Sequence, residues 1–365
     1  MTNEVQPACQ RRYGPHMQTA ATVSVPARWW CVVAVAPLIV GVGRTAGVEV
    51  LAPRELSVAV TREGFAFMEG TPSDRHVVAI DRDGQPMYRR AVPVVARAAR
   101  MVGTSTGVAI GWHDGDKLQF ARVTGDGQLG EVSTWGKRVA QLCEGTASNE
   151  HQWGVAWLQK DGRVWVLHGP TRRREPRAKD REVDQMDQEV TAELASTTWC
   201  GVTSAGKHLV LLWRDTANRT FMNQCDDKRC ESAVVRVPIA AKQQLAGIAC
   251  VERMCLVAVR DERGGASLAW ITTLRGKVVW VKPLPDATAA TTFSITAAGD
   301  QAFVVGYVTR EGATATRVIE SGSMVRAWAD PYSSEPPVVA WANDRLLVAH
   351  RHGDNVAPEI VPLPR

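Results

Sequence analysis

Hydrophobic residues after about position 48 occur in short runs of five or six, separated by polar turns rich in Gly and Asp. One pattern recurs seven times: a six-residue hydrophobic run, usually ending in a large aromatic residue, followed within a few residues by Asp, Glu or Gly. Successive runs end 43 to 48 residues apart, except for one interval of 56. The seven runs end at Phe67, Trp112, Trp157, Trp213, Val259, Tyr307 and His350.

Each repeat divides into four short strands. In the fifth repeat, CLVAV, ASLAWITT and KVVWVKPLP follow LAGIACVERM, with polar turns between them. Short runs rich in Val, Ile, Thr and aromatic residues, bounded by Gly and Asp, predict antiparallel strands. Turns such as DRDG at 81–84, TGDG at 124–127 and LRG at 274–276 supply residues that tolerate positive φ. No amphipathic helix of useful length follows Gly43.

A period of 43 to 48 residues with four strands is typical of a β-propeller blade. We therefore predict an all-β fold, a seven-bladed β-propeller spanning residues 48–365. Trp112, Trp157 and Trp213 occupy equivalent repeat positions. They are expected to pack between neighbouring blades, because large aromatic side chains bury much apolar surface.

The two ends of the predicted propeller complement each other. The last repeat supplies only three strands, whereas VEVLAP at Val48–Pro53 precedes the first repeat and belongs to none. We predict that this N-terminal strand completes the last blade as its outer strand, because a closed ring leaves no open sheet edge.

Residues such as HVVAIDRDGQPMYRR and GVAIGWHDGDKLQFARVTGDGQLGE resemble the degenerate β-propeller repeats of many exported bacterial proteins. ASLAWITTLRGKVVW is similar to the quinoprotein-like repeat that ends in Gly-x-x-x-Trp. The likeness covers nearly all of residues 48–365. Proteins with such repeats include binding scaffolds, hydrolases, lyases and quinone-dependent enzymes, so the resemblance implies the fold and no particular activity.

The N-terminal region, residues 1–47, contains an apolar run at 29–43 between Arg28 and Arg44. A membrane-spanning helix needs about 20 residues, whereas the apolar part of a signal peptide has about 7 to 15. We therefore predict a signal peptide, with a small-x-small cleavage motif at Gly41 and Gly43, and a periplasmic or extracellular protein. The alternatives are an uncleaved membrane anchor at 29–43 and a buried helix of a cytosolic protein.

Export changes the interpretation of the cysteines. Loss of the leader removes Cys9 and Cys31 and leaves an even set of six, which oxidising compartments favour as disulfides. Two pairs lie at predicted hairpins, in CDDKRC and CVERMC, and the third occupies matching positions on neighbouring inner strands. The predicted disulfide residues are Cys225 with Cys230, Cys250 with Cys255, and Cys143 with Cys200. A zinc site formed by the two hairpins is the alternative, but one turn is expected near the channel and the other near the rim.

The chain carries a net charge of +5, and six basic residues fall in one segment. This segment, 171–189, interrupts the repeat and is predicted to be a mobile surface loop, a proteolytic site or a docking loop for an anionic partner such as an envelope polymer. The rest is close to neutral, so no specific nucleic-acid surface is expected. The basic residues are Arg172, Arg173, Arg174, Arg177, Lys179 and Arg181.

Candidate catalytic and metal-binding residues are few. His350 and His352 lie two residues apart and would share a strand face, but a metal needs further ligands, and we predict no metal site and no cofactor. The predicted innermost strands supply four ionisable residues: Arg100, Glu144, Glu252 and Asp344. We therefore expect an exported binding or assembly scaffold for a protein or envelope polymer. The alternative is a hydrolase or lyase that acts on a polymeric substrate at the central channel with unidentified catalytic residues.

Overall fold

The computed structural model describes residues 56–95, 98–149, 152–170, 186–189, 197–225, 234–288, 291–299, 302–320, 323–330, 336–342, 344–352 and 354–362. These residues belong to the second of two compact units, Leu51–Arg365. Their regular structure consists of strands. Within these ranges the chain has no helix that is long and apolar enough to cross a membrane.

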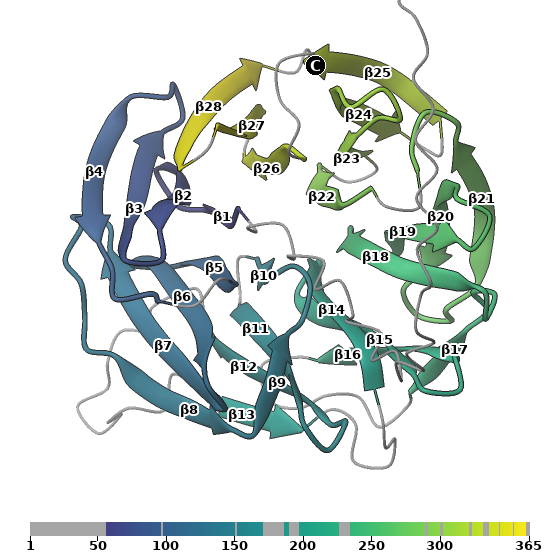
Figure 1. Ribbon diagram of the computed structural model, residues 1–365, viewed down its shortest axis with the longest axis horizontal. Helices are drawn as coiled ribbons and strands as arrows, with labels where there is room; N and C mark the ends of the chain where they lie inside the picture. Colours follow the sequence, from purple (N-terminus) through teal and green to yellow (C-terminus); the bar gives the residue numbers. More distant parts are fainter. Residues whose placement is uncertain are drawn as a thin grey trace, which may run out of the picture. The chain divides into compact units, whose positions relative to one another are not determined.

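The strands form seven small antiparallel sheets arranged in a ring, which confirms the predicted seven-bladed propeller (Figure 1). Blade 1 contains β1 (Val58–Val60), β2 (Gly64–Thr71), β3 (Asp74–Asp81) and β4 (Pro86–Ala91). Blade 2 contains β5 (Ala99–Thr104), β6 (Gly107–Asp114), β7 (Lys117–Thr124) and β8 (Ser133–Lys137). Blade 3 contains β9 (Val139–Leu142), β10 (Ala147–Ser148), β11 (Gln152–Gln159), β12 (Val164–Pro170) and β13 (Met186–Glu189). Blades 4 and 5 contain β14 (Thr197–Ala205), β15 (His208–Asp215), β16 (Thr220–Cys225) and β17 (Val235–Val237), then β18 (Gln243–Cys250), β19 (Met254–Asp261), β20 (Ala266–Thr272) and β21 (Val278–Leu284). Blades 6 and 7 contain β22 (Phe293–Ala298), β23 (Ala302–Val308), β24 (Thr314–Glu320) and β25 (Ser323–Asp330), then β26 (Val338–Ala342), β27 (Arg345–His352) and β28 (Asn355–Pro362).

The first strand of each blade, taken as β10 in blade 3, lies nearest the centre of the ring (Figure 1). Neighbouring first strands contact each other around the circle, and β1 contacts both β5 and β26. The first and last blades are therefore adjacent, and the seven first strands together surround a central channel.

The recurrent aromatic residue lies in the second strand of its blade and packs between blades. Trp112, Trp157, Trp213 and Tyr307 are at most 2% exposed. Each belongs to a hydrophobic cluster formed by two neighbouring blades, as predicted for the three tryptophans. Burial of these large side chains holds adjacent sheets together, which is why the aromatic position recurs with the blade period.

The acidic residue that follows the aromatic position forms the next turn. The carboxylates of Asp161, Asp215 and Asp261 accept backbone N–H groups two to four residues further on, at 2.8 to 3.2 Å. Such bonds stabilise tight turns. The predicted positive φ is found at Gly84 and Gly127, at 83° and 81°. The repeat therefore encodes a packing position followed by a hairpin.

Small residues let the innermost strands approach one another closely. A Cβ atom on Gly103 in β5 would lie 1.7 Å from the Val60 carbonyl oxygen of β1. Inner-strand hydroxyls also connect blades: Met101 N–H donates to Ser57 Oγ at 2.7 Å, and Val339 N–H donates to Ser294 Oγ at 3.0 Å. The glycine and serine residues here thus have a structural role.

Blade 3 departs from the prediction in two places. Each repeat is predicted to have four strands, but the inner strand of this blade is divided into β9 and β10, which both pair with β11. Residues 186–189, assigned to the end of the charged loop, instead form β13, which pairs with β12. The predicted loop therefore ends too late at Glu189, because its last four residues add an outer strand to the sheet.

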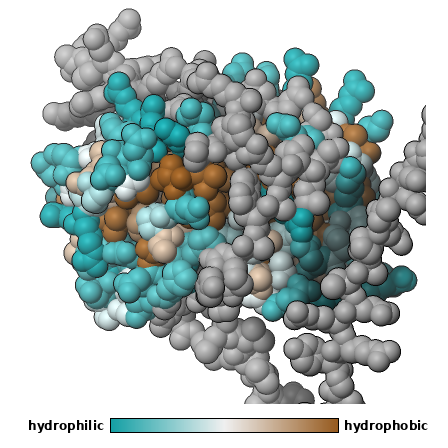
Figure 2. All heavy atoms as spheres, turned by 90° about the horizontal axis from the view of Figure 1, so that it is seen from above, coloured by the Kyte–Doolittle hydropathy of each residue, from teal (hydrophilic) through white to brown (hydrophobic). Residues whose placement is uncertain are grey.

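Blade 7 shows three strands among the described residues, as its sequence predicts. The proposed closing strand, Val48–Pro53, lies outside the described residues. Figure 2, seen from the side of the ring where β25 and β28 lie in Figure 1, shows a hydrophobic area with hydrophilic residues beside it.

Candidate binding site at the central channel

The seven inner strands enclose a cavity of about 1260 Å³. Every blade contributes to its lining, mostly with small apolar and hydroxyl side chains, and with the aromatic rings of Phe293 and Trp341. Ligand pockets commonly have volumes of about 300 to 1,000 Å³. The channel is therefore large enough for a small molecule or for a segment of a polymer.

The ionisable side chains that line this cavity, within the described part of the chain, are four arginines and one glutamate. Arg62 and Arg82 follow β1 and β3 and lie toward the end of the channel where the inner strands finish. Arg100 lies near the beginning of β5, and Arg260 pairs with Gln244 near the beginning of β18. The arginines therefore lie toward both ends of the channel.

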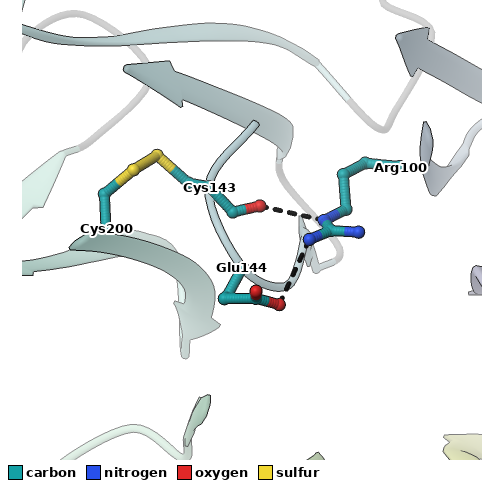
Figure 3. The surroundings of a disulfide bond; sticks show 4 residues. All are labelled: Arg100, Cys143, Glu144 and Cys200. Atoms are coloured by element: carbon teal, nitrogen blue, oxygen red, sulfur yellow. Dashed lines mark hydrogen bonds and ion pairs between the residues drawn. A yellow bond between two sulfur atoms is a disulfide. The ribbon is translucent and has the colours of Figure 1, made fainter. Parts of the chain in front are cut away.

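Arg100 and Glu144 form an ion pair. Arg100 Nη2 lies 3.1 Å from Glu144 Oε2, and Arg100 Nε–H donates to the Cys143 carbonyl at 2.9 Å (Figure 3). The Arg100 side chain is 9% exposed, whereas that of Glu144 is 43% exposed. The carboxylate is therefore accessible to solvent at the channel while its guanidinium partner is buried.

The backbone of Glu144 is fixed by blade 4. Cys143 is joined to Cys200 of β14 by a disulfide with a Cα–Cα distance of 4.8 Å (Figure 3). Glu144 N–H donates to the Cys200 carbonyl at 2.8 Å, and Val202 N–H donates to the Glu144 carbonyl at 2.9 Å. This parallel bridge between blades explains why the inner strand of blade 3 is divided here. The covalent bond and two hydrogen bonds position Glu144 from the neighbouring blade.

Arg260 of β19 is a second arginine of the same lining. Its Nε–H donates to the Thr291 carbonyl at 2.9 Å, at the start of blade 6. Burial lowers the pKa of the Arg260 guanidinium, and the charge of Glu144 acts in the opposite direction. Because guanidinium groups stay protonated in proteins, Arg260 adds a positive charge to this side of the cavity.

Sequence reasoning found part of this site. The structure brings Arg100 and Glu144 together, but Glu252 and Asp344 do not line the cavity. The sequence did not point to Arg62, Arg82 and Arg260, because these residues come from turns and from a second strand and not from the innermost strands. A repeat signal exists for Arg260: it directly follows the last residue of the recurrent run, as Arg214 and Arg351 do in their repeats.

The predicted disulfides are confirmed where the structure describes both cysteines. Besides Cys143–Cys200, Cys250 and Cys255 face each other across the β18–β19 hairpin with a Cα–Cα distance of 4.0 Å and are joined. Cys225 is also disulfide-bonded, and its predicted partner, Cys230, lies outside the described residues. Since Cys250 and Cys255 are oxidised, the alternative of a four-cysteine zinc site is excluded.

The other predicted sites stay predictions. In β27, His350 is 8% exposed and His352 is exposed. The described residues contain no group of three or more His, Cys, Asp and Glu side chains placed to hold a metal ion. The basic residues between Arg172 and Arg181 lie outside the described part of the chain.

Comparison with known proteins supports the fold alone. No family model and no curated protein matches the sequence. Among solved structures, the BP39L lectin from Burkholderia pseudomallei is similar with a TM-score of 0.59 and 12% identity, over 85% of this chain and 96% of the lectin. A structure from an analysis of two prolyl endopeptidases is similar with a TM-score of 0.50 and 10% identity, over 86% of this chain and 51% of that protein. At such identities the likeness shows the propeller fold and no activity.

Proposed function

We propose that this protein is a binding or assembly propeller that takes its ligand at the central channel. The observation that carries this proposal is the cavity of about 1260 Å³, whose described ionisable lining is four arginines and one glutamate. General acid–base catalysis uses groups that exchange a proton near the working pH, which guanidinium groups do not do. This lining favours binding over the alternative of a hydrolase or lyase.

We further propose that the protein works outside the cytoplasm, in the periplasm or beyond the cell. Two disulfides in the described residues support this location, because such bonds persist mainly in oxidising compartments. The apolar segment at 29–43 supports it independently. The partner is a protein or an envelope polymer, and the BP39L lectin is an example of this fold in a protein named for carbohydrate binding.

A channel-blocking variant tests the binding site. Ser105 lines the cavity in the β5–β6 turn and is half-buried, so Ser105→Trp narrows the channel without filling the core. We expect this variant to bind an array of glycans and envelope polymers at least about tenfold more weakly than the wild type. Ser73→Trp, in the exposed β2–β3 turn away from the cavity, is the matched control and should bind normally.

Two results would contradict the proposal. Equal binding by the wild type and Ser105→Trp would show that the ligand does not enter the channel. Release of shortened polymer products by the wild type, with loss of that turnover in Ser105→Trp, would favour the enzyme alternative.

Fractionation tests the proposed location. The full chain, expressed in a bacterium with two membranes, should appear in the periplasm with its cysteines resistant to alkylation. A chain lacking residues 29–43 should stay in the cytoplasm with alkylatable thiols, because reducing systems there keep cysteines reduced. Cytoplasmic retention of the full chain would argue against export.

A further inference from the structure

We infer that the channel ligand is an anion with at least two negative groups, that Arg100 and Arg260 hold it, and that Glu144 competes with it. This inference rests on the proposed function, since it names the chemical class of ligand that the same channel takes. The negative groups are carboxylates or phosphates, which both suit the planar donor pattern of arginine.

The cavity carries a positive charge. Four arginines and one glutamate give the described lining of the cavity a net charge of +3. A cleft that is lined by one sign of charge and walled by protein concentrates its field and attracts ligands of the opposite sign. Most of the remaining lining is small apolar or hydroxyl side chains, so the arginines dominate the electrostatics of the channel.

Hydrogen bonds hold Arg100 and Arg260 in position. Arg100 is held by its bond to the Cys143 carbonyl, and Arg260 by its bond to the Thr291 carbonyl. Both belong to the cavity lining, and both are near enough to Glu144 for its charge to act on them. Guanidinium groups held by the protein before the ligand arrives lose little freedom on binding, which favours affinity.

Glu144 occupies the position of an anionic ligand group. Its backbone is fixed to blade 4, but its side chain is 43% exposed and pairs with a guanidinium whose side chain is 9% exposed. The carboxylate thus stands where an anionic group of a ligand would meet Arg100. A ligand must share or displace this contact, so Glu144 lowers the affinity for anions instead of providing it.

Arg62 and Arg82 determine how long a ligand must be to contact both ends of the channel. Arg82 Nη2–H donates to the Arg62 carbonyl at 3.0 Å, and both side chains are exposed toward the opposite end of the channel. An inner strand of about six residues spans about 20 Å. A small anion therefore contacts only the Arg100–Arg260 side, whereas a longer anionic chain reaches both ends.

Isothermal titration calorimetry at low salt tests the inference with four probes: citrate, pyrophosphate, trigalacturonate and the uncharged maltotriose. We expect at least one anionic probe to bind and maltotriose to fail. Stronger binding of citrate than of pyrophosphate would indicate a carboxylate ligand, and the reverse a phosphate ligand. Raising the salt concentration should weaken binding, because mobile ions screen the attraction.

Removing the charge of Arg260 and removing that of Glu144 should change the affinity for the anion in opposite directions. Arg260→Gln should weaken binding of the anionic probe about tenfold, whereas Glu144→Gln should strengthen it severalfold, because one removes an attractive charge and the other a repulsive one. Arg236→Gln is the matched control, since Arg236 is an exposed arginine on β17 outside the cavity lining. Urea unfolding of each variant verifies that the fold is retained.

The inference is overturned if no anionic probe binds, if maltotriose binds equally well, or if Glu144→Gln weakens binding as Arg260→Gln does. A different result would reject this inference but keep the proposed function. If Ser105→Trp abolishes binding of a glycan or polymer while Arg260→Gln and Glu144→Gln leave it unchanged, the channel binds a ligand but not through these charges.

Discussion

At the residue scale, an arginine that directly follows the recurrent hydrophobic run connects one blade to the next. Arg214 is 4% exposed, and its guanidinium donates to Thr220 Oγ1 at 3.0 and 3.2 Å. It also donates to the carbonyls of Ala240 and Gln243, which lead into blade 5. Arg260 makes the corresponding bond into blade 6. The position thus ties the second strand of a blade to the start of the following blade.

Substituting Arg214 by Met tests this role. The change keeps most of the side-chain volume but removes the hydrogen bonds to the buried Thr220 hydroxyl and to the Ala240 and Gln243 carbonyls, so we expect the free energy of unfolding to fall by about 2 to 4 kcal/mol. Urea denaturation measures the loss. Arg214→Lys should recover less than half of it, because an ammonium group lacks the planar fork. Arg236→Met, at an exposed position, should change stability by less than about 0.5 kcal/mol, and an equal loss there would contradict the assignment.

At the scale of elements, the two described disulfides stabilise different connections. Cys143–Cys200 joins blade 3 to blade 4 across a sequence separation of 57, whereas Cys250–Cys255 closes a hairpin with a separation of 5. In the chain-entropy model a longer closed loop removes more freedom from the unfolded chain. The interblade bond should therefore stabilise the fold more than the hairpin bond.

Paired serine variants measure the difference. Cys143→Ser with Cys200→Ser should lower the free energy of unfolding by about 4 kcal/mol, and Cys250→Ser with Cys255→Ser by about 2 kcal/mol. Urea unfolding with and without dithiothreitol is the measurement, since a reductant should remove most of the difference between each variant and the wild type. Equal losses from the two pairs would contradict the loop-length argument.

At the scale of the whole molecule, the parts that could be predicted from sequence depend on local chemistry. The buried aromatic position of Trp157 has a counterpart in most repeats, and the turn formed by Asp161 recurs at Asp215 and Asp261, so period and composition indicate the blade. The site depends on the ring instead. Arg62 and Arg260 line one cavity because the blades curve around an axis, and the inner strand divides at Glu144 because blade 4 supplies its partner. The repeat period along the chain does not indicate which residues of distant blades meet in the cavity or which blade pairs with Glu144.

Ring closure is the whole-molecule feature that the sequence predicts and an experiment can decide. β28 pairs with β27 on one side, so half of its backbone groups point away from that partner. If Val48–Pro53 pairs with this edge, those amides are protected from hydrogen exchange. Replacing Val48 and Val50 by Asp would weaken the pairing, because Asp is disfavoured in strands and two like charges two residues apart share one strand face.

We expect hydrogen exchange of residues 355–362 to be at least about tenfold faster in the Val48→Asp, Val50→Asp variant, since local opening sets amide protection. Val23→Asp with Val25→Asp has the same spacing at a position outside the predicted propeller, and it should leave β28 unchanged. Amides of β27 serve as the internal reference, because they bond to β26 and β28 in either case. Unchanged exchange in β28 would mean that another segment, or solvent alone, covers its edge, and that the first and last blades meet without a shared sheet.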